Sequence, residues 1–97
     1  MNMITKHLSA EKMAQEIAEA VINRYENSDL DRVNVYLSAS KAVVKEFSGI
    51  ISPLRTEVVG MVRKIVAEKT NSRWFINIVG YEAGGLCELN AQCMLTY

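Results

Sequence analysis

The sequence is poor in the residues that most often build metal and catalytic sites, with one histidine and two cysteines among 97 residues. It also has a single proline and no apolar run near the ~20 residues that a membrane helix needs. The N-terminal stretch lacks the apolar centre of a secretory signal. These absences argue against a membrane span and favour a cytoplasmic protein.

Charge of one sign is also missing, because eleven basic side chains are balanced by eleven acidic ones. No general electrostatic field favours nucleic acid or an acidic membrane. The apolar fraction of 49% is ordinary for a globular protein. We therefore expect one domain over 1–97, in which residues 1–8 are flexible or form a short extra strand.

The few candidate reactive groups do not combine into a site. His7 is alone near the N-terminus. Cys87 and Cys93 are separated by roughly 20 Å if they lie on one strand, which is too far for a disulfide. Neither has a base nearby in sequence, so we expect two buried, reduced thiols. The sequence predicts no catalytic residue, no metal site and no cofactor, and hence no enzyme.

Two helices are predicted from capping residues and apolar spacing. Ser9 begins the first, over residues 9–26. Ser52 and Pro53 begin the second, which Asn71 ends. Its apolar positions recur at three and four residues: Leu54, Val58, Met61, Val62, Ile65 and Val66. We expect Met61 and Ile65 to lie in the core.

The C-terminal part of the chain predicts a hairpin of fixed register. A four-residue turn at 82–85 sets Tyr81 opposite Leu86 and Trp74 opposite Cys93. Every pair on one face is then apolar or small, whereas a slip of one residue would bury Glu88. Another strand is predicted at 32–38, where apolar and polar residues alternate.

The segment 39–51 has two interpretations. Its apolar residues fit a strand over 42–47 after a turn, and they also fit a helix over 39–51. We favour the strand. The predicted fold class is then α+β, in the order α-β-β-α-β-β, as an antiparallel sheet with two helices packed on one face.

The sheet face turned away from the helices is the candidate functional surface. It is expected to present Tyr36, Phe75, Val79, Tyr81, Leu86 and Met94. Apolar surface of this kind marks protein interfaces. We therefore expect a non-catalytic protein-binding module, a regulator, adaptor or inhibitor of a larger assembly. It is also expected to be a homo-oligomer, because the strand 86–97 has no Pro or Lys to block edge pairing.

Two alternatives stay open. Aromatic side chains on a sheet can stack RNA bases, which would make the protein a nucleic-acid-binding module. The zero net charge and the lack of Lys or Arg beside the aromatics disfavour that interpretation, since Arg73 and, across the turn, Arg63 and Lys64 are the only basic residues expected nearby. A small-ligand binder or an unrecognised enzyme is the third alternative. The glycine-rich segment 80–85 does not support it, because this segment joins two strands, whereas a phosphate-binding loop joins a strand to the N-terminus of a helix.

One stretch resembles a known family. Trp74-x-x-x-Ile78-Val79-Gly80, after a Lys-rich helix end and Asn71, is similar to the helix-to-strand junction of dynein light chains. The resemblance covers the segment 52–81, and the Trp-to-Gly interval is one residue longer than in that family. It implies a small α+β homodimer that binds a peptide strand at a sheet edge.

Overall fold

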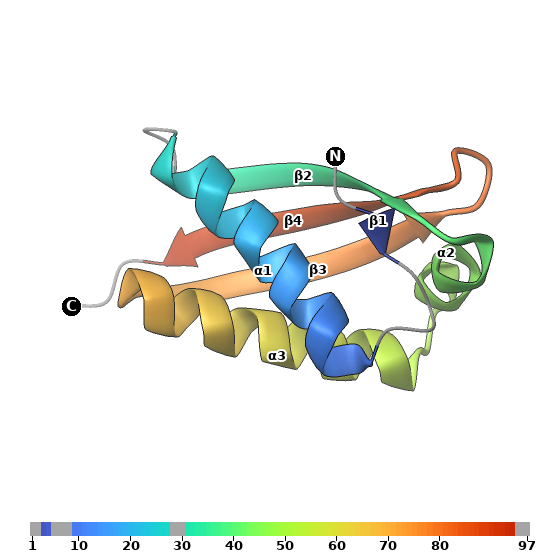
Figure 1. The fold of residues 1–97 in the computed structure, drawn as a ribbon, viewed down its shortest axis with the longest axis horizontal. Coiled ribbons are helices and arrows are strands. Elements are labelled where there is room, and N and C mark those ends of the chain that lie inside the picture. Colours follow the sequence, from blue (N-terminus) through green and yellow to red (C-terminus); the bar gives the residue numbers. More distant parts are fainter. Residues whose placement is uncertain (1–2, 5–8, 28–30, 95–97) are drawn as a thin grey trace.

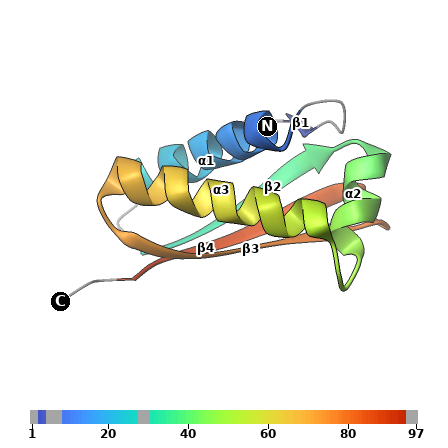
Figure 2. The same cartoon turned by 90° about the horizontal axis from the view of Figure 1, so that it is seen from below.

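The computed structural model describes residues 3–4, 9–27 and 31–94 and has two layers. The elements are β1 (Met3–Ile4), α1 (Ala10–Glu26), β2 (Arg32–Ala39), α2 (Lys41–Ser48), α3 (Pro53–Thr70), β3 (Arg73–Tyr81) and β4 (Leu86–Met94). The strands form one sheet, and α1 and α3 cross the same face of it (Figure 1; Figure 2). The predicted α+β class is confirmed, with helices on one face of a sheet in which β2, β4 and β3 are antiparallel, while the two-residue β1 runs parallel to β2. His7 lies outside the described residues.

The preference for a strand near residues 42–47 was wrong, because this segment is the helix α2. Ser40 caps it by accepting a hydrogen bond from the N–H of Val43 at 3.4 Å. Val43, Val44 and Phe47 are buried, which is the one-sided spacing of a helix. Within the described residues the order is therefore α-β-α-α-β-β after the two-residue β1, with three helices in place of two.

The caps of the two long helices were predicted correctly. The hydroxyl of Ser9 accepts from Lys12 N at 3.2 Å, and that of Ser52 accepts from Arg55 N at 3.1 Å. Asn71 ends α3 in the left-handed conformation, with φ of 51°. Asparagine adopts this conformation more readily than most residues, which explains the stop.

The register of the hairpin is also as predicted. Tyr81 pairs with Leu86, and Trp74 pairs with Cys93 at the other end. The turn closes through Gly85, whose N–H donates to the carbonyl oxygen of Tyr81 at 3.0 Å. Gly85 has a φ of 63°, where a side chain would be strained.

The position of β4 corrects the expectation that this strand is an edge. The strand order is β1-β2-β4-β3, so β4 is paired on both sides. Its second partner is β2, which runs antiparallel with Val35 opposite Leu89. Residues 95–97 of the predicted strand lie outside the described residues. The described sheet instead has β3 at one edge, and β1 covers only Ser38 and Ala39 of β2 at the other.

The core lies between the sheet and the helices. α3 turns Val58, Val62 and Val66 fully inward, at a spacing of four residues. Met61 and Ile65, which were predicted to lie in the core, are only partly buried and pack against it, so that prediction holds only in part. A helix has 3.6 residues per turn, so residues at i and i+4 share a face, and in α3 the fully buried face is this row of valines.

Trp74 and Cys93 are buried neighbours, as predicted. The indole N–H of Trp74 donates to Thr70 Oγ1 at 2.7 Å, which satisfies its one polar atom. Tyr25 packs edge-on against the indole, with ring centroids 5.0 Å apart. Cys87 is also buried, and desolvation raises the pKa of its thiol to about 11. Both thiols therefore belong to the core.

Gly80 allows α2 to sit directly on β3. A Cβ at this position would clash with the carbonyl oxygen of Val44 and lie 2.9 Å from the N of Ser48. These are backbone atoms that cannot swing away. Gly60 is different, since a Cβ there would meet no atom within 4 Å.

The two glycines make a matched pair of stability tests. Gly80→Ala is expected to lower the free energy of unfolding by about 1–3 kcal/mol or more, because α2 must shift. Gly60→Ala is expected to raise it by about 0.4–1 kcal/mol, because alanine favours the helix and fits the space. Urea denaturation measures both. A harmless Gly80→Ala would contradict the close packing of α2 on β3.

Thiol chemistry gives a second test of the core. The thiolate is the reactive form, and burial and the raised pKa of Cys87 keep it scarce at pH 8. A bulky maleimide should therefore label neither Cys87 nor Cys93 in the native protein, and both in denaturant. Mass spectrometry counts the adducts. Fast native labelling of Cys93 would overturn the register of β4.

Candidate functional site

All six predicted surface residues lie on the sheet face opposite the helices, which we call the outer face. Phe75 is 56% exposed and Tyr36 is 49% exposed, and Tyr81 and Met94 are also exposed. Val79 and Leu86 are half-buried. Intervening residues such as Ile78 point into the core, so the alternation of β2, β3 and β4 produces this surface.

The pairing of the strands arranges the outer face in rows that run across β2, β4 and β3. In order they are Arg32, Gln92 and Phe75; Asn34, Asn90 and Asn77; Tyr36, Glu88 and Val79; and Ser38, Leu86 and Tyr81. Before the first row, Met94 pairs with Arg73. The second row, which we call the asparagine row, divides the face into two halves.

One half contains a carboxylate held between two tyrosines. The hydroxyl of Tyr81 donates to Glu88 Oε1 at 2.9 Å, and that of Tyr36 donates to Glu88 Oε2 at 3.3 Å. The three residues come from β3, β4 and β2, so they tie the strands together across the outer face. The hydrogen bond to Glu88, followed by the charge of its carboxylate, raises the pKa of Tyr81 above its ordinary value of 10.0.

The other half contains two exposed arginines. Arg32 shares a row with Phe75, and Arg73 begins β3 beside Met94. The outer face is therefore basic on one side of the asparagine row and acidic at Glu88 on the other. Arg73 was among the basic residues expected near the aromatics, whereas Arg32 was not, so the place of Arg32 in the row of Phe75 corrects that expectation. The sequence did not reveal it because the pairing of β2 with β4 joins distant segments.

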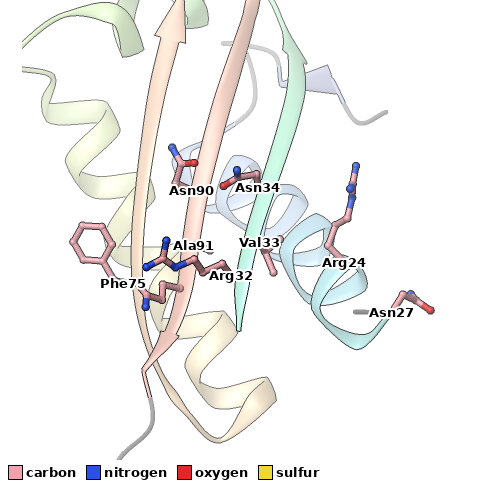
Figure 3. A pocket seen from close by; sticks show the side chains of 9 residues that line it. Arg24, Asn27, Arg32, Val33, Asn34, Phe75, Asn90 and Ala91 are labelled. Carbon is pink, nitrogen blue, oxygen red and sulfur yellow. The ribbon is translucent and has the colours of Figure 1, made fainter. Parts of the chain in front are cut away.

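A hollow of about 720 Å³ lies in the basic half and continues round the start of β2. Arg32, Asn34, Asn90, Gln92 and Phe75 border it on the outer face, together with Val33 and Ala91, with Arg24 of α1 and with Asn27, which caps the end of that helix. Figure 3 shows Arg24 and Asn27 beyond β2, on the side away from Phe75. The hollow is open and has both apolar and cationic borders.

A second exposed apolar pair lies in the connection between α2 and α3, and the sequence pattern did not predict it as a surface. Ile50 is 95% exposed and Ile51 is 89% exposed. Arg55 holds this connection in place by donating to the carbonyl oxygens of Phe47, Gly49 and Ile50 at 2.6–2.8 Å. The pair lies outside the strands that form the outer face.

The described part of the chain has neither a cluster of metal ligands nor a membrane-spanning helix. No group of three or more His, Cys, Asp or Glu side chains there is placed to hold a metal ion. Among the helices of the described residues, none combines the length and apolarity of a membrane span.

Comparison with known proteins gives no relative. No protein-family model, no curated protein and no solved structure matches this chain. The similarity of 52–81 to dynein light chains thus remains a local resemblance.

The tyrosine pair gives a pH test of this site. A raised pKa means that the protonated hydroxyl is favoured in the folded protein. The resulting stabilisation is present below the unfolded pKa of about 10 and is lost as the pH rises through the folded pKa. NMR titration of the Tyr81 ring should show Glu88→Gln lowering its pKa toward the ordinary value. Glu82→Gln, in the turn, is the control and should leave the pKa unchanged.

Proposed function

We propose that the protein is a non-catalytic protein-binding module that also associates with copies of itself through the outer face. The observation that supports this most is the exposure of large apolar side chains on one open sheet face, above all Phe75 and Tyr36. Contiguous apolar surface is uncommon on monomers, and aromatic residues, methionine and arginine are enriched at interfaces. The outer face has all of these.

The free energy gained by burying these apolar side chains is large enough to support association. Burial of one phenylalanine-sized side chain contributes about 1.5–3 kcal/mol before the entropy of association is subtracted. A second copy buries two such patches at once. Exposed ion pairs contribute only about 0–1 kcal/mol each, so apolar contact is the main source of affinity.

A nucleic-acid-binding module is the second candidate, because Arg32 shares a row with Phe75. Aromatic stacking combined with arginine is how single strands are bound. Salt separates the two functions, since phosphate contacts make affinity fall steeply as the salt concentration rises. Fluorescence anisotropy with a labelled single-stranded oligonucleotide at two salt concentrations tests this candidate directly.

Self-association is tested by Phe75→Asp. The carboxylate would lose its water in the interface, so the variant should sediment as a monomer at about 100 µM, where the wild-type protein should form a dimer or larger oligomer. Circular dichroism should show the fold retained, because the Phe75 side chain is 56% exposed.

Ile50→Asp is the matched control, since it places the same charge at an exposed apolar position outside the strands of the outer face. It should leave the oligomer intact. If it dissociates the oligomer and Phe75→Asp does not, the interface is the connection between α2 and α3. A monomeric wild-type protein would contradict self-association altogether.

A further inference from the structure

The outer face is complementary to itself, and we infer that a second copy of this chain seats on it about a twofold axis that runs along the asparagine row. This geometry rests on the proposed self-association and specifies its partner and orientation. The register of the rows fixes what each half of the face would meet in the second copy.

A rotation by 180° about this row places each strand opposite the same strand of the second copy. It also places each half of the outer face opposite the other half of the second copy. Across β2, Tyr36 then meets Arg32 of the second copy, because they lie one row on either side of the asparagines. Across β3, Tyr81 meets Arg73 and Val79 meets Phe75 by the same count. An arginine over an aromatic ring is a favourable cation–π pair, and the other pair is apolar.

The charges agree with this arrangement. Glu88 lies beside Tyr36 in its row, so the facing Arg32 of the second copy comes within reach of the carboxylate. No like charges of the described outer face oppose each other. The hollow bordered by Arg32, Gln92 and Phe75 receives the Tyr36–Glu88 pair of the second copy.

The asparagine row suits a twofold axis. Each of Asn34, Asn90 and Asn77 meets its own copy there, and an amide is its own hydrogen-bonding complement, with a donor and an acceptor. Sheets that pack face to face keep their strands within about 30° of alignment, so these pairings hold approximately over the short strands.

The competing twofold axis runs along β4, and the charges oppose it. That axis would set Glu88 against Glu88 of the second copy and Arg32 against Phe75. Two facing carboxylates repel, and such repulsion in an interface costs enough to reject a wrong orientation. The axis along the asparagine row avoids this contact.

Charge exchange tests the orientation. One variant is Glu88→Lys, and the other is the double variant Arg32→Glu with Arg73→Glu. Each alone opposes like charges in both halves of the dimer, so its dissociation constant should rise at least about tenfold over wild type. In an equimolar mixture every charged contact is again between opposite signs, so heterodimers should form. Sedimentation velocity and fluorescence energy transfer between labelled copies measure both.

Cross-linking gives an independent readout of the axis. Asn34→Cys and Asn77→Cys should each link to its own copy through a short bis-maleimide, whereas the axis along β4 would link only one variant to the other. The wild-type protein, with its thiols buried, is the control. Dimers that link only Asn34→Cys to Asn77→Cys, or a charge-exchange mixture that stays monomeric beside a dimeric wild type, would overturn this orientation and leave self-association standing. A monomeric wild-type protein would overturn the proposed function itself.

Discussion

The register between β3 and β4 is the constraint on which the rest of the structure depends. Gly85, with its left-handed φ, closes a four-residue turn and sets Tyr81 opposite Leu86. Side chains alternate strictly along a strand, so a slip of one residue in β4 would exchange the buried Leu89 for Glu88. The same alternation that builds the core therefore also decides which side chains face outward. The same register therefore determines both the core face and the outer face of the sheet.

The helices leave one face of this sheet open. α1 and α3 cover its inner face, and α2 reaches the backbone of β3 only because Gly80 has no side chain (Figure 2). With the inner face closed by three helices, the exposed aromatic residues have no cover within the described parts of the chain. Such a one-sided arrangement is stable for an antiparallel sheet only when the other face tolerates water. The asparagine row and the Tyr36–Glu88–Tyr81 hydrogen bonds supply that tolerance.

Local signals predicted most of the fold, and contacts between distant segments were missed. Ser52 and Asn71 act on adjacent backbone, and the hairpin register follows from counting across one turn. The segment that forms α2 is too short for its periodicity to separate strand from helix, and only its packing on Gly80 decides. The pairing of β2 with β4 joins segments about fifty residues apart, and no local pattern encodes it. That pairing brings Arg32 into the row of Phe75, so the charge distribution of the site could be determined only from the structure.

In the proposed dimer, the affinity and the orientation of binding would come from different residues of the outer face. Its apolar side chains are spread over both halves, with Phe75 on one side of the asparagine row and Val79 on the other, so burial alone favours many placements of a partner. Its charges are few and divided between the halves, and exposed ion pairs add little free energy. Their effect is to penalise placements that bring like charges together, which is how charges usually contribute to recognition. A chain with zero net charge can therefore still select the direction in which a partner binds.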